Sequence, residues 1–505
     1  MSTSGGYGGQ DPDPSWWRGW SARGLVLACA LAVTAGAVWW AQPEDTGCGP
    51  GVEWVGEGEH RACVGVTDAA GGFSFDPELD RVTARIAQEN DRVTDAAGED
   101  GGTPFVSVVY AMPMSPASGE SMVSVRHELE GAYAGLIAAN QTRGQGNSPQ
   151  IRLLLGNTGA TDEQWRHTSD QILGQAREER VVAVAGLGTS LAPTLDMVEA
   201  LTAADIPVFG GTLTADDLEE LDGLVRAAPP NSDEAAAAVQ FLRTEERADD
   251  RVLVVQDQDE DDRYAATLGR AFLDLLPPGR LADDEPMVFD SSQGDPSSYF
   301  AQQMANLCLA EPDVVYFAGR STELRSFLAP LARRYCNDRP LTVLSGDDAS
   351  QTTQQEGFEE IAQALEDGNI ELVYTGLAHP GAWEQSPEAF DRLALAPFRA
   401  EDGPLTELDD GQAIMGHDAV LMAVRAIRST GRDRDLSAAD VLRMLPSLNG
   451  ANAIPGASGW ISLRNNGSPE NKAIPVISIE PNGRLVTLMV TSAGGEPYLP
   501  PTRGD

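Results

Sequence analysis

A loop rich in glycine and hydroxyl residues, AGLGTSLAPTL at 185–195, is the part of the sequence best suited to chemistry. It follows an apolar, β-branched run at 181–184 and precedes a helical pattern. Such a loop at a helix N-terminus offers free backbone N–H groups to an anionic or polar partner. It could hold a dinucleotide, a phosphate, an attacking serine or a small metabolite.

Nucleotide binding fits this loop poorly. A dinucleotide fingerprint needs G-x-G-x-x-G/A on the first strand–helix turn, whereas Gly186 and Gly188 are followed by Leu191 on the third predicted strand. A P-loop needs a lysine in a glycine-rich turn, and the sole lysine, Lys472, lies elsewhere. We therefore expect no nucleotide and no other cofactor.

Nucleophilic and metal chemistry are also disfavoured. Ser190 and Ser345 follow predicted strands, but neither lies in the G-x-S-x-G elbow of a serine hydrolase. The 5 histidines contain no pair at metal-ligand spacing. The acidic run 257–262, DQDEDD, lacks the glycine and closing glutamate of a calcium loop and is expected to be solvated. We expect no catalytic residue and no metal ligand, so the sequence does not predict an enzyme.

Alternating strand and helix patterns position this loop. Apolar runs separated by helical patterns predict an α/β fold with parallel sheets covered by helices on both faces. The predicted strands are 105–111, 151–157, 181–186, 206–211, 251–257, 287–290, 313–319, 341–347 and 371–376. The final part, 459–490, predicts further strands joined by turns.

Hydroxyl and carboxyl side chains follow the predicted strands, and ligands of parallel sheets bind at these strand ends. Thr189 and Ser190 follow one strand and Thr212 follows the next, which would suit the carboxylate of an amino acid. Asp347 or Asp348, on a facing lobe, would meet an ammonium group. The alternative is that the hydroxyls only cap their own helices.

The N-terminal segment predicts a membrane anchor. The stretch 24–41 carries no charge and is just long enough to span a bilayer as a helix. Arg18 and Arg23 precede it, so the tail 1–23 is expected in the cytoplasm and the rest of the chain outside. A cleaved signal peptide and lipidation at Cys29 are the alternatives.

Charge and cysteines agree with an exported chain. The formal net charge of −42 disfavours nucleic-acid binding, which needs basic patches. Four cysteines outside the anchor allow three pairings, and sequence proximity favours Cys48 with Cys63 and Cys308 with Cys336. Unpaired, buried thiols are the alternative.

The order of motifs from 104 to 490 resembles the type I periplasmic-binding-protein family, in particular the extracellular receptors of the branched-chain amino-acid type. The motifs that carry the resemblance are HELEGAYAGLIAAN, IRLLLGNTGATDEQ, VVAVAGLGTSLAPTLDMVEALTAADIPVFGG, RAAPPNSDEAAAAVQFL, VLVVQDQDEDDRYAATLGRAF, PDVVYFAGRSTELRSFLAPL, LSGDDAS, GHDAVLMAVRAI and GWISLRNNGSPENKAIPVISI. Each motif alone is weak, and their joint order is specific.

The resemblance implies two Rossmann-like lobes joined by three hinge crossings and closing on a small ligand. Lobe one would be 103–228 with 376–444, and lobe two 229–375 with 445–492. A stalk at 42–102 would precede them and a tail at 493–505 would follow.

The resemblance also implies a set of ligand-binding residues. The loops matching the family's carboxylate contacts carry Thr189, Ser190, Gly210, Gly211 and Thr212. Tyr264 matches the tyrosine that closes over the ligand, and Asp347 or Asp348 matches the acid that takes the amino group. The chain departs from the family at Asn157, where an aspartate is common, and at Arg320, which would favour a more anionic ligand.

A membrane-anchored extracellular receptor is the function that this resemblance implies. It would capture an amino acid or a related polar metabolite, without covalent chemistry, and deliver it to an ABC transporter permease. The alternative is a ligand sensor or a non-transport scaffold of the same fold.

Overall fold

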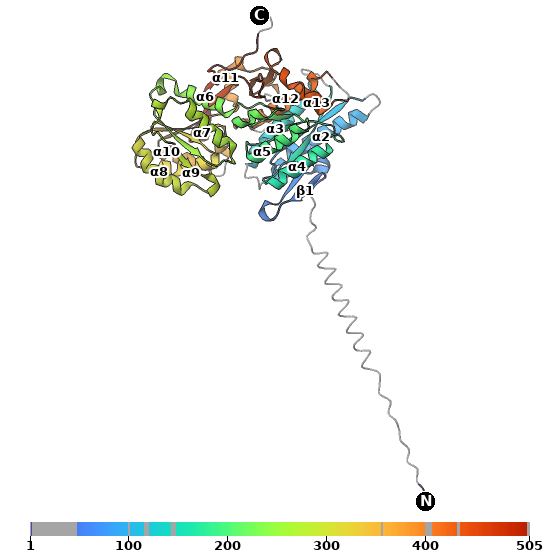
Figure 1. Ribbon diagram of the computed structural model, residues 1–505, viewed down its shortest axis with the longest axis horizontal. Helices are drawn as coiled ribbons and strands as arrows, with labels where there is room; N and C mark the ends of the chain where they lie inside the picture. The colour runs from blue at the N-terminus through green and yellow to red at the C-terminus, as the bar shows by residue number, and fades with distance from the viewer. Residues whose placement is uncertain are drawn as a thin grey trace. The chain divides into compact units, whose positions relative to one another are not determined.

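Two seven-stranded sheets, each covered by helices, form the described part of the chain in the computed structural model (Figure 1). The structure describes residues 2, 48–98, 102–115, 121–142, 148–354, 357–398, 407–431 and 435–501. The chain divides into two units, 1–48 and 49–505, and every helix and strand described below lies in the second.

The predicted membrane anchor at 24–41 lies outside the described residues. Among the residues that are described, no helix is both long enough and apolar enough to cross a bilayer.

The sheet of lobe one has the strand order β1-β2-β4-β3-β5-β6-β7. β3 to β7 run parallel, while β1 and β2 add an antiparallel hairpin at the edge. Its strands are β1 (Val52–Val55), β2 (Ala62–Thr67), β3 (Phe105–Met112), β4 (Gln150–Asn157), β5 (Val181–Gly186), β6 (Val208–Gly210) and β7 (Leu224–Arg226). The helices around it are α2 (Asp80–Gly98), α3 (Met122–Gln141), α4 (Asp162–Gln175) and α5 (Ala192–Ala203).

The sheet of lobe two has the order β16-β15-β12-β11-β10-β8-β9. Its strands are β8 (Val252–Asp257), β9 (Met287–Phe289), β10 (Val314–Ala318), β11 (Leu341–Ser345), β12 (Ile370–Thr375), β15 (Ile474–Ile479) and β16 (Leu485–Thr491). β8 to β12 run parallel, and β15 pairs antiparallel with β12. The helices are α6 (Asn231–Leu242), α7 (Arg263–Leu275), α8 (Ser297–Ala310), α9 (Ser321–Ala332) and α10 (Phe358–Asp367).

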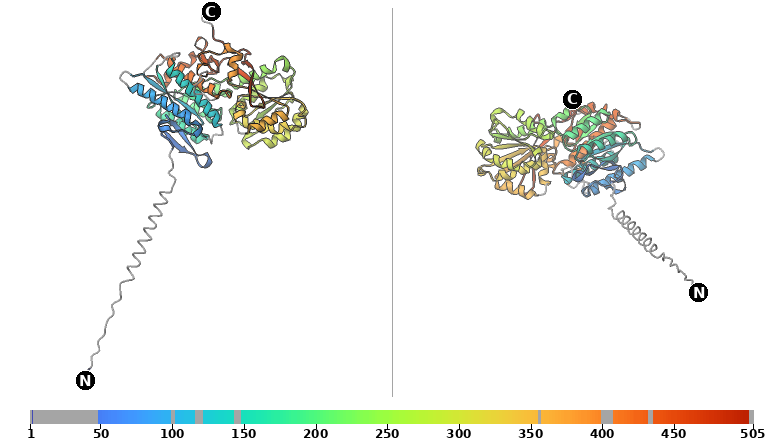
Figure 2. Two further views of the ribbon diagram at one scale, coloured as in Figure 1. Left: turned by 180° about the vertical axis from the view of Figure 1, so that it is seen from behind. Right: turned by 60° about the horizontal axis from the view of Figure 1, so that its bottom comes forward.

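The chain crosses between the lobes three times: after β7, after β12 and before β15. Between the second and third crossings, several short elements and one long helix return to lobe one, as the orange and red segments of Figures 1 and 2 show. These elements are α11 (Pro380–Gln385), α12 (Gln412–Ser429), α13 (Ala438–Leu442), β13 (Ile454–Gly456) and β14 (Gly459–Ile461). The prediction of an α/β fold with two parallel-sheet lobes is therefore confirmed.

Two segments belong to lobe one, although the sequence analysis placed them in lobe two or in a stalk. Ile454 and Ile461, placed in lobe two by the resemblance, are buried in the core of lobe one. The segment predicted as a stalk contributes β1, β2 and α2 to lobe one, where Val82 and Ile86 of α2 join the same core. The apolar side chains in these segments indicated that the segments are buried. They did not indicate which of the two sheets the segments pack against.

Helices α3 and α12 pack with their backbones in close approach. A Cβ at Gly131 would collide with the carbonyl of Ala413, and a Cβ at Gly416 would collide with the carbonyl of Glu128. The missing side chains let the two helices touch directly. The α3 segment that carries Glu128 therefore packs directly against α12.

A buried polar network surrounds the only lysine of the chain. Lys472 Nζ donates to Ser458 O and Ser458 Oγ at 2.7 Å each, and to Gly459 O at 3.0 Å. Ser458 Oγ donates in turn to Asp418 Oδ2, and Asp418 also meets His417 at 2.8 Å. This network ties α12 to the segment that leads into the third crossing.

The predicted disulfide between Cys308 and Cys336 is present and joins the end of α8 to the segment after α9. Cys48 and Cys63 are both disulfide-bonded.

Candidate functional site

A small polar cavity lies between the lobes, at the carboxyl ends of strands from both sheets. Its volume is about 30 Å³. Among the residues that line it are most of those selected from the sequence: Thr189, Ser190, Thr212, Tyr264, Arg320, Asp347 and Asp348. Gly210 and Gly211 lie outside the lining, although a Cβ at Gly211 would come within 3.5 Å of Glu128 Oε1.

The lobe-one hydroxyls bond to neighbouring loops. Ser190 Oγ accepts hydrogen bonds from the backbone N–H groups of Thr214 and Ala215, at 3.0 and 3.3 Å. Thr212 Oγ1 donates to Gly188 O at 2.8 Å. Helix α5 begins after Leu191 and has no side-chain cap, so Ser190 and Thr212 do not cap it. Both hydroxyls instead tie the loop after β5 to the loop after β6.

Arg320 carries the positive charge of the cavity wall. Its Nε and Nη2 donate to the two oxygens of Asp262 at 2.6 and 2.7 Å, and its Nη1 donates to Asp348 Oδ1 at 3.1 Å. The guanidinium also lies 4.5 Å from the ring centroid of Tyr264. Burial alone would lower the pKa of Arg320, but Asp262 and Asp348 raise it well above its usual value. The guanidinium is thus a charged group already paired within lobe two.

A second acidic group lies beside this arrangement. The backbone N–H of Asp347 donates to Glu234 Oε2 at 3.2 Å, and Thr375 Oγ1 donates to the same oxygen at 3.1 Å. The carboxyl groups of Glu234 and Asp347 also hydrogen-bond to each other, which requires that one of them holds a proton. Burial raises the pKa of Asp347 to about 7, and the charge of Asp348 adds to the rise. Burial, followed by the charge of Asp347, raises the pKa of Glu234 well above its usual range.

Sequence reasoning missed three carboxyl groups at this site. Glu128 on α3 lines the cavity and accepts a hydrogen bond from the Tyr110 hydroxyl at 2.7 Å. Glu234 sits in the first turn of α6, and Asp262 caps α7 by accepting from Ala265 N–H. The acidic run 257–262 was expected to be solvated, but Asp257 and Asp262 within it are buried. No sequence signal set Glu128 apart, because α3 also carries Arg126, His127 and a second acid, Glu130.

Contacts between the lobes close one side of the cavity. The N–H of Ala192 donates to Asp261 O at 3.1 Å, and the N–H of Tyr264 donates to Ser190 O at 3.3 Å. An ion pair between Arg263 of lobe two and Asp217 of lobe one is a further contact between the lobes. The two lobes are therefore in a closed arrangement around the cavity.

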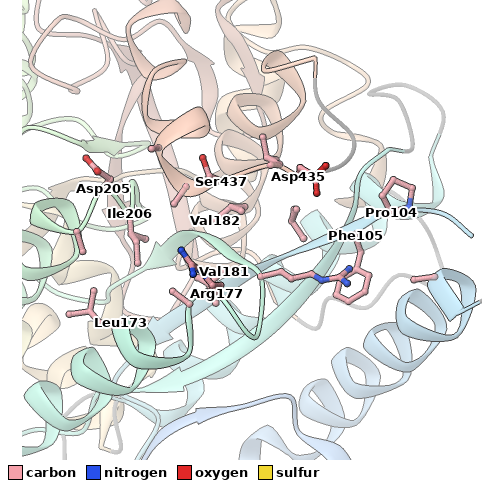
Figure 3. A pocket seen from close by; sticks show the side chains of 18 of the residues that line it. Pro104, Phe105, Leu173, Arg177, Val181, Val182, Asp205, Ile206, Asp435 and Ser437 are labelled. Carbon is pink, nitrogen blue, oxygen red and sulfur yellow. The ribbon is translucent and has the colours of Figure 1, made fainter.

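A larger hollow of about 910 Å³ lies at the opposite end of the lobe-one strands (Figure 3). It is lined by Phe105 and Val181 at the starts of β3 and β5, and by Arg177 and Arg180. Arg180 lies 4.7 Å from the ring centroid of Phe105. We take the smaller cavity as the candidate site, because both lobes supply polar groups to it and because it lies at the strand ends where such sheets bind ligands.

Comparison with protein families finds no match, and comparison with curated protein sequences finds none. Solved structures do resemble the chain. The leucine-binding protein LivK of Thermotoga maritima is 18% identical, with a TM-score of 0.55 over 76% of this chain and 98% of that one. LivJ of Streptococcus pneumoniae, in complex with isoleucine, is 17% identical, with a TM-score of 0.56 over 77% and 99%.

A solute-binding protein of an ABC transporter from R. palustris, in complex with 4-hydroxybenzoate, is 13% identical and has a TM-score of 0.57 over 77% of this chain and 96% of that one. At these identities the likeness establishes the fold. The chain has the fold of type I periplasmic binding proteins.

Proposed function

Starting from a type I periplasmic binding fold, we propose that this protein captures a small polar solute between its two lobes. The observation that carries the proposal is the polar cavity to which both lobes contribute side chains at their strand ends. A solute in this position would stabilise the closed arrangement of the lobes by population shift.

Transport is the role that we propose for this capture. The similar structures are substrate-binding proteins of ABC transporters, and they are described with amino acids or an aromatic acid bound. An ABC permease would receive the solute, and the uncharged stretch 24–41 would anchor the binding unit outside the cell membrane. The binding residues would be Thr189, Tyr264, Arg320 and Asp347, whose side chains line the cavity.

A ligand sensor or a non-transport scaffold is the second candidate. It is favoured by the small cavity and by Arg320, whose guanidinium is paired with Asp262 and Asp348 inside the closed protein. When the charged groups at the lobe interface are already paired with each other, the lobes can close without a solute. The closed state would then not tell a transporter whether a solute is bound.

A thermal-shift and calorimetric screen tests the proposal. The purified full-length chain is titrated with amino acids, organic acids and amines. A solute at about 100 times its dissociation constant should add roughly 2.7 kcal/mol of stability. Binding by one chemical class supports solute capture. A well-folded protein that binds none of them points to the scaffold.

A further inference from the structure

Two backbone hydrogen bonds join the loop after β5 in lobe one to the loop after β8 in lobe two. The N–H of Ala192 donates to Asp261 O at 3.1 Å, and the N–H of Tyr264 donates to Ser190 O at 3.3 Å. The two residues between these bonds pair as in an antiparallel ladder. We call this pairing of 190–192 with 261–264 the interlobe bridge. Because each bond has one partner in each lobe, the bridge breaks when the lobes separate.

The carboxylate of Asp262 fixes the lobe-two side of this bridge. Its Oδ1 accepts from the N–H of Ala265 and so caps the start of α7. Both of its oxygens also accept from Arg320, Oδ2 from Nε at 2.6 Å and Oδ1 from Nη2 at 2.7 Å. Asp262 is only 7% exposed, and a carboxylate this buried is costly once its cation is removed. Without Arg320, Asp262 would regain a partner by turning to water, which moves the loop that forms the bridge.

Arg320 is surrounded as a bound cation would be. Proteins recognise a planar guanidinium through carboxylates that accept its N–H groups and through an aromatic face. Asp262 accepts from two nitrogens of Arg320, and Asp348 accepts from the third at 3.1 Å. The ring centroid of Tyr264 lies 4.5 Å from the guanidinium. Because Arg320, Tyr264 and Asp348 all line the cavity, the chain supplies its own cation to the lobe-two wall.

We propose that Arg320 is an internal occupant of the cleft and that, through Asp262, it latches the interlobe bridge when no solute is bound. The proposal rests on the proposed function, because it states what controls access to the cavity in which we expect the solute. At rest the lobes are closed, and a solute enters only after the bridge has opened. The small fraction of open protein then lowers the apparent affinity for the solute.

Hydrogen exchange on the full-length protein, with no solute present, measures the bridge directly. Ala192 and Tyr264 donate its two hydrogen bonds, so the exchange of their amide protons reports its opening. We expect slow exchange in the wild type, and exchange roughly tenfold faster or more in Arg320→Ala. Asp262→Asn should have a similar effect, because asparagine keeps the size of the side chain and its helix-capping oxygen but loses the charge that binds Arg320.

Arg247→Ala is the matched control. Arg247 also belongs to lobe two, pairs with two acids, and lies 4.6 Å from the centroid of an aromatic ring. Its side chain is 20% exposed, against 19% for Arg320. It bonds to Thr342 and Glu371 at the starts of β11 and β12, at the opposite end of these strands from the cavity. Its loss should therefore leave the exchange of the two bridge amides as in the wild type.

Chemical rescue separates a bound cation from a general effect on folding. Ethylguanidinium fits the space that Arg320→Ala leaves, so it should restore slow exchange of the bridge amides in this variant, and the effect should saturate. Ethylammonium lacks the planar fork of N–H donors and should not restore it. Neither ion should change exchange in the wild type or in Arg247→Ala. Circular dichroism and the melting temperature establish that each variant is folded.

Four results would overturn the proposal. They are fast exchange of the bridge amides in the wild type, unchanged exchange in Arg320→Ala and Asp262→Asn, equal acceleration in Arg247→Ala, and no rescue by ethylguanidinium. These measurements use no solute, so they fail separately from the proposed function. If the exchange results hold and no solute in the screen binds, solute capture is wrong and the latch stands. If a solute binds and the variants exchange as the wild type does, the latch is wrong and solute capture stands.

Discussion

Replacing Lys472 by methionine tests the energetics of the network at the third crossing. Burial lowers the pKa of Lys472 to about 7, from an ordinary value near 10.5, although the charge of Asp418 opposes the shift. Between these two pH values the unfolded chain binds more protons than the folded chain. Stability therefore rises with pH across this window, and the contribution of the lysine is least favourable near and below pH 7.

The size of this effect follows from the shift. The unfolding free energy rises by about 1.4 kcal/mol per pH unit where the lysine is protonated only in the unfolded chain. The rise is smaller near pH 7, because the folded lysine is half protonated there. Raising the pH from 7 to 9 should therefore stabilise the wild type by about 2 kcal/mol. Lys472→Met removes the titrating group, so its stability should lack this increment. The chain has no other lysine that could imitate the effect.

Urea unfolding of both proteins at several pH values between 7 and 9 measures this prediction. The expected result is a difference in unfolding free energy, wild type minus variant, that grows by about 2 kcal/mol over the range. The variant should also be destabilised at every pH, since Ser458 O and Gly459 O lose their donor. A difference that does not change with pH would show that Lys472 keeps an ordinary pKa and would refute the reasoning.

Three further predictions concern other parts of the fold. Because burial raises the pKa of Asp347 to about 7, its contribution to stability is present below about pH 4 and is lost as the pH rises through 7. The unfolding free energy of wild type relative to Asp347→Asn should therefore fall between pH 4 and 8, and a constant difference would contradict the shift. Gly416→Ala should destabilise the protein by about 1–3 kcal/mol in denaturant unfolding, because the new Cβ meets the carbonyl of Glu128. Gly174→Ala, where a Cβ meets nothing within 4 Å, is its control and should be neutral or stabilising. Replacing Cys308 and Cys336 by serine opens a loop of 28 residues and should cost about 3–4 kcal/mol, measured by thermal unfolding under oxidising conditions. An unchanged melting temperature would show that the disulfide does not constrain the unfolded chain.

The sequence predicted the individual long strands better than it predicted which lobe each segment joins. Long apolar runs such as 105–111 and 151–157 are recognisable because both faces of these strands are buried, and β3 and β4 span them. β7 was missed because it consists of only Leu224–Arg226. The hairpin of β13 and β14 was assigned to the wrong lobe, since an apolar pattern does not say which core it enters.

The candidate site shows the same limit at the level of single side chains. Glycines, hydroxyls and acids at strand ends identified the loops, because parallel strands bring their carboxyl ends to one edge. Glu234 could not be recognised, since an acid in the first turn of a helix is ordinary for helix stability. Only the approach of α6 to the loop after β11 places Glu234 beside Asp347.

The discontinuous construction of both lobes has a consequence for folding during synthesis. The apolar strand β12, Ile370–Thr375, keeps an unpaired edge until β15, Ile474–Ile479, has been made, because β15 is its neighbour on that side of the sheet. Lobe one likewise waits for α12, which packs along α3 nearly three hundred residues earlier in the chain. Such distant contacts form late, and an open apolar edge invites pairing with other chains. During synthesis, the edge of β12 must therefore be protected from aggregation until β15 has been made. A chain truncated before β15 would keep this edge unpaired and would lack two strands of the lobe-two sheet.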